Sequence, residues 1–530
     1  MSSYYYYYYY YYYYYYYSSY YYQTEPGKTY EQTLLDVKAY ADAESIPYRY
    51  VLLDSWWYYR GAGGGVSVWD ARPDVFPRGL AYLRERTGWP TQLHNRYWAP
   101  DTNYSRANGG SYDFIDDGSK VVLPDDQRFW DDLIANKSAA GMFMYEQDWL
   151  DNEFDELRSL TASVTLGGRW MQQMNDGCVK SNVTIQMCMS HVRHILQSTE
   201  MPAVTNARAS GDYHPSGESG YQQWYLGKTS ILHHAVGLAP SKDNYWSTAT
   251  QNGTHYGNAT SEPRSRLQAA ASSLSAGPVA PSDRVNGSDA ALIVMACDAD
   301  GRLLTPDRPL TDLDAVIVAE AFGGGPGGHV MSTQTLLQRG SGSGSGNGSS
   351  GNGSGSGSGA AAAGDDAVLV RYVLAVDTDR EWNVTMAELF PFPAAGADVP
   401  PRLALAEQTA GCLGLLPGSG GAGAAGAVLS IPRVGDQDFK VYTLSPVLAG
   451  GFALLGEPRK WASVSNQRFS DLASAAAGSG GASVKLSGAA GEKVTVSWLD
   501  ANADKCVEAT CTLPSSGSAT MTVGASGASC

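Results

Sequence analysis

The sequence predicts an α/β fold, a (β/α)8 TIM-type barrel, followed by an all-β sandwich domain. From about residue 28 to 300, short apolar strands alternate with amphipathic helices, an order typical of parallel α/β sheets. After about residue 325, strand-like segments are separated by Gly, Pro and Ser without a long helix, which indicates a sandwich. A barrel is favoured over a doubly wound sheet because polar residues recur at strand ends and no strand opens a Gly-x-Gly-x-x-Gly turn.

The elements of the first half follow one another regularly. Leu34, Val37 and Ala41 stand at helical spacing before Pro47 ends the helix and a strand begins. Seven strands are expected, one short of eight, and the missing first strand falls in the tyrosine run from Tyr4 to Tyr17. The expected strands are 48–57, 89–98, 141–150, 183–190, 202–213, 230–241 and 277–283, and the expected helices are 30–47, 73–88, 128–140, 164–177, 191–199 and 264–275.

Three segments divide the chain. Residues 1–23 are a poly-Tyr low-complexity N-terminus, 24–325 the catalytic barrel and 326–530 the C-terminal β-sandwich. The strands expected in the sandwich are 329–337, 367–376, 438–447, 452–457, 482–488, 493–500 and 519–525. A Gly/Ser insertion at 340–364 has the composition of a disordered segment. It could be a linker between domains, but the strand-like residues before it favour an expanded hairpin loop.

Composition excludes several classes of function. The net charge is −16 and the isoelectric point about 4.9, and without a basic stripe nucleic-acid binding is not expected. No uninterrupted apolar run reaches the length of a membrane span. No metal or cofactor motif is evident, so neither is expected. Oligomeric state is not predicted.

The compartment can be inferred only indirectly. The N-terminus lacks the basic and apolar regions of a signal peptide. Asn-x-Ser/Thr sequons are nevertheless frequent, which favours a glycoprotein that is secreted or lies in the secretory-pathway lumen. Cys506, Cys511 and Cys530 crowd the C-terminus, where one disulfide is expected. The sequons begin at Asn103, Asn136, Asn182, Asn252, Asn258, Asn286, Asn347, Asn352 and Asn383.

Chemistry-bearing side chains gather where the barrel strands end. In a barrel these ends meet at one face, where reacting groups lie. Carboxylates alternate with tryptophans along these ends, which indicates a sugar site, because indole faces stack on sugar rings and carboxylates hold hydroxyls. The strand-end residues are Asp54, Trp56, Trp57, His94, Asn95, Arg96, Trp98, Glu146, Asp148, Trp149, Ser190, His191, Arg208, Ser210, Asp212, Lys242, Asp243, Trp246 and Asp283.

Two of these carboxylates are candidates for catalysis. Glycosidic cleavage needs one ionised and one protonated carboxyl group across the anomeric carbon. Asp148 and Asp212 end strands on opposite sides of the expected barrel mouth. They could therefore meet across a sugar.

Five motifs carry a resemblance to a known clan. They are YVLLDSWW, RPDVFPRGL, YEQDWL, RASGDYHP and the segment SAGPVAPSDRVNGSDA. Together they resemble the clan of retaining glycoside hydrolases that contains α-galactosidases (melibiases) and plant raffinose synthases. The resemblance extends from about residue 24 to 310 and more loosely beyond. It implies a barrel enzyme without a cofactor that acts on α-linked sugars.

The resemblance also implies roles for individual residues. Asp148 would be the nucleophile, Asp212 the acid/base, and Arg208 would hold the geometry of the site. The substrate-binding residues would be Asp54, Trp56, Trp57, His94, Arg96, Trp98, Glu146, Trp149, Arg208, Asp243 and Trp246.

The sequence departs from the clan at several places. Glu146 stands where the clan has a lysine, Leu53 replaces the first of two aspartates, and tyrosines replace the clan's first strand. An anion in place of a cation could raise the pKa of Asp148 or change the accepted sugar. The alternative is therefore a catalytically inactive carbohydrate-binding pseudoenzyme on the same barrel.

Overall fold

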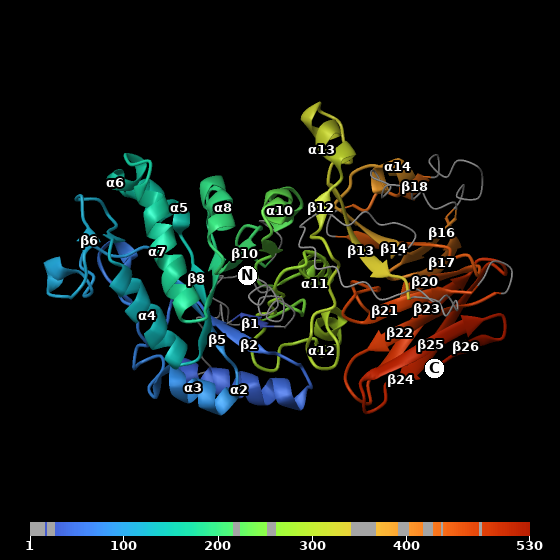
Figure 1. Ribbon diagram of the computed structural model, residues 1–530, viewed down its shortest axis with the longest axis horizontal. Helices are drawn as coiled ribbons and strands as arrows, with labels where there is room; N and C mark the ends of the chain where they lie inside the picture. The colour runs from blue at the N-terminus through green and yellow to red at the C-terminus, as the bar shows by residue number, and fades with distance from the viewer. Residues whose placement is uncertain are drawn as a thin grey trace, which may run out of the picture. The chain divides into compact units, whose positions relative to one another are not determined.

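The computed structural model divides into two compact units (Figure 1). The first comprises Met1–Cys297 with Gly301–Leu303, and the second Asp298–Asp300 with Leu304–Cys530. The second unit thus begins before residue 325, where the boundary was expected. Strand β12 (Thr311–Asp312) already pairs with β13 in the second unit. The structure describes residues 16–18, 27–215, 223–251, 261–340, 367–390, 402–416, 428–435, 438–475 and 480–530.

A seven-stranded parallel sheet forms the centre of the first unit. Its first strand comes from the tyrosine run, where Tyr16 pairs with Tyr50 of the next strand. The segment 230–241, expected as one strand, is helical up to Ala235 and forms a strand only at its end. The strands in sheet order are β1 (Tyr16–Ser18), β2 (Tyr50–Leu53), β5 (Thr91–Asn95), β8 (Met142–Gln147), β9 (Thr184–Met187), β10 (Val204–Arg208) and β11 (Ala239–Ser241).

The segment expected as the last barrel strand, 277–283, forms no regular strand. It makes one parallel bridge, between Tyr245 and Pro281. Ala280 nevertheless packs in a core cluster with Tyr50 and Leu52 of β2. Within the described residues the expected eight-stranded barrel is thus a sheet of seven strands. The segment 277–283 packs against the core without adding an eighth strand.

Helices follow the strands and lie around the parallel sheet (Figure 1). Helix α4 begins where the Asp126 carboxylate accepts from the Arg128 amide, and it buries Phe129, Trp130 and Ile134. Gly177 lets α7 approach α4, since a Cβ there would lie 2.9 Å from the Trp130 backbone. The helices are α2 (Tyr30–Ala43), α3 (Gly79–Thr87), α4 (Gln127–Ala139), α5 (Leu150–Glu156), α6 (Arg158–Thr161), α7 (Leu166–Lys180), α8 (Val192–Gln197), α10 (Leu226–Ala235), α11 (Ser265–Leu274) and α12 (Ala290–Ile293).

Short elements also occupy the loops of this unit. Two antiparallel pairs, β3 (Tyr59–Arg60) with β4 (Val66–Val68) and β6 (Phe114–Ile115) with β7 (Leu123–Pro124), follow β2 and β5 along the chain. The 3-10 turns are Ala62–Gly64, Arg106–Asn108, Ser198–Glu200 and Val294–Ala296.

The second unit consists of antiparallel sheets. Its six-stranded sheet packs on one side, through Ala404, against Leu455 and Leu499 of a three-stranded sheet. Each of the seven segments expected as strands forms one, and eight further strands lie among the described residues. The strands are β12, β13 (His329–Gln338), β14 (Ala367–Val376), β15 (Trp382–Thr385), β16 (Leu403–Glu407), β17 (Gly411–Leu415), β18 (Val428–Ile431), β19 (Phe439–Pro446), β20 (Phe452–Gly456), β21 (Phe469–Ser474), β22 (Ala482–Ser487), β23 (Lys493–Asp500), β24 (Lys505–Thr512), β25 (Ser518–Gly524) and β26 (Gly527–Ser529); the helices are α13 (Asp314–Ala321) and α14 (Met386–Leu389).

The Gly/Ser insertion joins two neighbouring strands. β13 and β14 pair antiparallel along their whole length, from His329 with Val376 to Gln338 with Ala367. The insertion between them therefore connects the two strands of a hairpin, the arrangement that the sequence favoured. Residues 341–366 themselves lie outside the described part of the chain.

Cysteine pairing is more extensive than expected. Two disulfides, Cys412–Cys506 and Cys511–Cys530, lie in the second unit. Cys178, Cys188 and Cys297 are buried and form no disulfide. None of the helices described is both long and apolar enough to cross a membrane.

Candidate active site

A cavity of about 230 Å³ lies at the carboxyl ends of the parallel strands in the first unit. Strands β2, β5, β8, β9, β10 and β11 all contribute residues to its wall, and this is the end of a parallel barrel at which reacting groups gather. Nine of the predicted site residues line it: Asp54, His94, Arg96, Glu146, Asp148, Trp149, Arg208, Asp212 and Asp243.

Four of the predicted tryptophans are not in the cavity. Trp57 and Trp246 are fully buried, and Trp98 packs edge-on against Phe129 at 5.0 Å between ring centroids. Trp56 stacks on Tyr30. These four rings are buried and do not line the cavity, so they are not placed to bind sugar there, as was expected, by stacking for Trp56 and Trp98; of the predicted tryptophans Trp149 lines the cavity.

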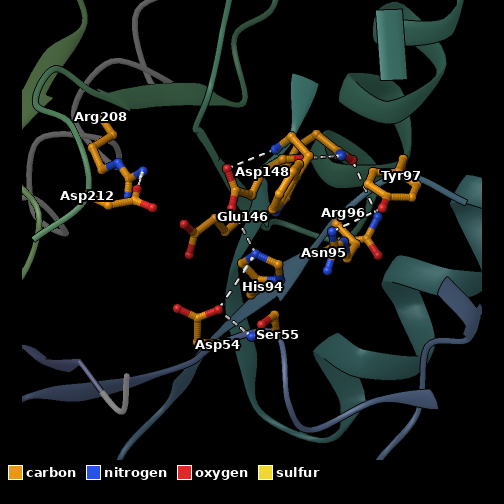
Figure 2. A network of polar contacts seen from close by, with 12 residues as sticks. Asp54, Ser55, His94, Asn95, Arg96, Tyr97, Glu146, Asp148, Arg208 and Asp212 are labelled. Carbon is orange, nitrogen blue, oxygen red and sulfur yellow. Dashed lines mark hydrogen bonds and ion pairs between the residues drawn. The ribbon is translucent and has the colours of Figure 1, made fainter. Parts of the chain in front are cut away.

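His94 connects the carboxylates of neighbouring strands (Figure 2). Its Nε2 lies 3.1 Å from Asp148 Oδ2 and 3.8 Å from Asp54 Oδ1. Its Nδ1 lies 3.1 Å from the Tyr58 hydroxyl, which fixes the plane of the ring. Burial opposes the charge of His94, but the two carboxylates outweigh it and raise its pKa. The imidazolium is therefore favoured between the two carboxylates.

Asp148 is buried and nevertheless held ionised. Burial alone would favour its neutral form, but the hydrogen bond and charge of His94, the charge of Arg208 and the thiol of Cys188 lower its pKa to about 2. Its Oδ1 also accepts the Trp149 amide at 2.8 Å. The carboxylate is thus fixed in position and charged at any pH near neutrality.

Glu146, two residues earlier on β8, behaves in the opposite way. Burial raises its pKa to about 8, and the charges of Asp148 and Asp54 add to that effect against those of His94 and Arg208. Its Oε2 accepts a hydrogen bond from Gln92 Nε2 at 3.0 Å. At neutral pH this side chain is a carboxylic acid.

Arg208 gathers two further carboxylates. It is ion-paired with Asp212, and its Nη1 lies 3.4 Å from Asp243 Oδ1. In Figure 2 the Arg208–Asp212 pair lies apart from the group formed by His94, Glu146 and Asp148. Asp243 is fixed further by the Tyr213 amide, which donates to its Oδ2.

Lys242, a strand-end residue to which the sequence assigned no role, also lines the cavity. It is buried, and its Nζ lies 3.3 Å from the Asp243 carbonyl; burial lowers its pKa to about 8. Sequence reasoning missed several other residues of the cavity wall. Gln186 faces the cavity from inside β9, where strand alternation could have identified it. The other missed residues are Leu52, Ser55, Arg60, Met189 and Ser241.

No group of three or more potential metal ligands occurs among the described residues.

Comparisons with known proteins identify the fold. No family model matches the sequence, and no curated protein matches it. A GH27 β-L-arabinopyranosidase from Geobacillus stearothermophilus, as a variant in complex with arabinose, matches with a TM-score of 0.55 and 13% identity over 82% of this chain and 96% of that one. The wild-type form of that enzyme gives a TM-score of 0.54, 12% identity and the same coverage. A GH36 α-galactosidase from the same organism covers 78% of this chain and 53% of its own, with 11% identity and a TM-score of 0.46.

The chain has the fold of the α-galactosidase, or melibiase, clan. In this melibiase-type fold the parallel sheet supplies the cavity, and the likeness extends over most of the chain. The neighbours named above are glycosidases, as the motifs of the sequence led us to expect.

Proposed function

We propose that this protein is a glycoside hydrolase or transglycosidase that acts on α-linked, α-galactoside-like sugars by a retaining, double-displacement mechanism. The observation that carries the proposal is Asp148, a buried carboxylate kept ionised at the strand-end cavity of a melibiase-type fold. A nucleophile needs this state, because only the carboxylate can attack an anomeric carbon.

In the first step an Asp148 oxygen would form a bond to the anomeric carbon while the bond to the leaving oxygen breaks. Asp212 would give its proton to that oxygen. In the second step Asp212 would take a proton from water or from an acceptor sugar. The oxygen of that molecule would form a bond to the anomeric carbon while the bond to Asp148 breaks. His94 and the Trp149 amide would hold the Asp148 carboxylate in line through both steps.

The Arg208–Asp212 ion pair sets a condition on this mechanism. Asp212 is engaged by the Arg208 guanidinium, so this ion pair must open before Asp212 can act as the acid. Asp243 lies 3.4 Å from Arg208 and offers the guanidinium a second partner. A bound sugar that displaces Asp212 from Arg208 would therefore activate the acid.

The same ion pair, together with Glu146, supports the second candidate, a catalytically inactive carbohydrate-binding protein. Its proposed acid would remain paired, and binding would proceed without turnover.

Capture of a covalent intermediate separates the two candidates. The wild-type protein would be incubated with an activated 2-deoxy-2-fluoro α-galactosyl donor and analysed by mass spectrometry. We expect one added sugar on Asp148, no addition to Asp148→Asn, and full labelling of the control Asp155→Asn, whose carboxyl group is exposed. Sugar binding without capture in the wild type would favour the inactive protein, and hydrolysis of an aryl α-galactoside by Asp148→Asn would refute the nucleophile.

We also propose that the protein passes through the secretory pathway. The sequon asparagines among the described residues, Asn103, Asn136, Asn182, Asn286 and Asn383, are all exposed, as acceptors of glycans must be. Loss of mass on enzymatic removal of N-glycans from protein made in a eukaryotic host would support this; unchanged mass would refute it.

A further inference from the structure

Glu146 faces the cavity beside the proposed nucleophile. Glu146, near the end of β8, and Asp148, just after that strand, both line the cavity. Glu146 is paired in register with His94 of β5, and Gln92 of β5 donates to its Oε2. With Oε2 engaged, Oε1 is the oxygen left for a group in the cavity.

Burial disfavours the ionised form of Glu146. Glu146 is only 5% exposed and forms no ion pair with a Lys or Arg among the described residues. A buried carboxylate without a positively charged partner is costly. The charges of Asp148 and Asp54 add to this effect, whereas those of His94 and Arg208 oppose it. The titratable and charged groups that face it are Tyr50 and Asp54 from β2 and its end, His94 from β5, Asp148 after β8, Cys188 after β9 and Arg208 from β10.

We propose that Glu146, as a neutral carboxylic acid, donates a hydrogen bond from Oε1 to an uncharged hydroxyl oxygen of the bound sugar and so determines which sugar the cavity accepts. The inference rests on the proposed function and deepens it. The clan that the sequence resembles has a lysine at this position, so the donor is kept while its positive charge is lost. The cavity would therefore accept neutral sugars and bind them only while Glu146 keeps its proton.

This dependence gives the affinity an upper pH limit. If only the protonated form binds, the dissociation constant is divided by the protonated fraction. With a pKa of about 8, that fraction falls from about 0.9 at pH 7 to about 0.1 at pH 9, so the affinity should fall about tenfold. The Glu146→Gln variant keeps an N–H donor and cannot ionise, so it should lack this tenfold loss; a change that remains in it over this range would come from other groups of the cavity, such as Lys242 with its pKa of about 8.

Two measurements test the inference on the whole chain. Titration of ¹³C-labelled glutamate carboxyl groups by NMR, without ligand, should show one signal with a midpoint near pH 8 that is absent from Glu146→Gln. Calorimetry with D-galactose and L-arabinose at pH 7 and 9 should show the tenfold loss in the wild type and in Glu153→Gln. Glu153 is a matched control, because it is buried with a raised pKa but does not line the cavity.

The two proposals fail in different ways. A Glu146 signal that titrates below pH 6, or a wild-type affinity equal at pH 7 and 9, would overturn the role of Glu146, and so would a Glu146→Met variant that binds as tightly as the wild type. Failure of the proposed function would instead appear as sugar binding with the expected pH dependence but no covalent capture and no turnover.

Discussion

Replacing His94 should shift the acid limb of the pH–activity profile to higher pH, because His94 keeps Asp148 ionised. The Asp148 pKa of about 2 lies below the usual 3.8, and this difference corresponds to about 2 kcal/mol in favour of the carboxylate. The His94 hydrogen bond of 3.1 Å and its charge are the largest contributions that oppose burial. In His94→Gln burial is left less opposed, so we expect the pKa of Asp148 to rise above 3.8.

The consequence can be worked out at pH 3. With a pKa of about 2, about 90% of wild-type Asp148 is ionised there; with a pKa of 3.8 or more, less than about 15% is. The kcat/KM for an aryl α-galactoside, relative to its value at pH 6, should therefore be at least about sixfold lower in His94→Gln than in the wild type. Initial rates after a pH jump, with circular dichroism to confirm folding, measure this.

The sign of the stability effect follows from the same shift. A carboxyl group whose pKa is lowered by folding stabilises the fold above its unfolded pKa, and this stabilisation is lost as the pH falls toward 2. His191→Gln is the matched control, because His191 also pairs with an aspartate, Asp155 at 3.0 Å, but is not in the cavity. If the acid limbs of His94→Gln and the wild type coincide while that control behaves normally, the proposed cause of the Asp148 charge is wrong.

Three further outcomes are expected. Trp57→Ala should lower the free energy of unfolding in urea by about 3–5 kcal/mol and leave KM unchanged, because Trp57 is fully buried outside the cavity. Cys412→Ser should lower the unfolding free energy by about 4–5 kcal/mol, because its disulfide with Cys506 spans 94 residues. The wild type should lose about 4 kcal/mol of stability between pH 4.5 and 8 relative to Glu146→Gln, since a carboxyl group whose pKa is raised by folding destabilises the fold as the pH rises.

Each of these has a clear contrary result. A raised KM with unchanged stability in Trp57→Ala would place the ring in the sugar site after all. Equal unfolding curves for Cys412→Ser and the oxidised wild type would mean that the disulfide does not form. Parallel stability–pH curves for the wild type and Glu146→Gln would show that Glu146 titrates normally.

The positions of the strand-end carboxylates were predictable from sequence, whereas those of the tryptophans were not. Parallel strands that alternate with helices place their carboxyl ends together, so the predicted topology places Asp54, Asp148 and Asp212 at one face. A residue just past a strand can turn inward to the cavity or outward to the helices, however. Trp57 turns into the core, where its Nε1 donates to the His94 carbonyl, and the sequence contains no signal for that choice.

The first barrel strand shows another limit of sequence. A run of identical tyrosines has no pattern of its own, so no residue within it is marked for pairing. The register is set by the partner strand, β2, with which Tyr16, Tyr17 and Ser18 pair. Composition therefore indicated where the strand was missing, but could not show which residues form it.

The two carboxyl groups at the end of β8 show how the structure separates an acid from a base. Asp148 and Glu146 are both buried and two residues apart, so burial alone would raise the pKa of each. They differ in their hydrogen-bond partners: Asp148 accepts from the His94 ring and a backbone amide, whereas Glu146 accepts only from the uncharged amide of Gln92 among the described residues. A hydrogen bond from a charged donor stabilises an anion more than one from a neutral amide. His94 therefore keeps Asp148 ionised. Burial, together with the charge of Asp148, keeps Glu146 protonated although the charge of His94 opposes this.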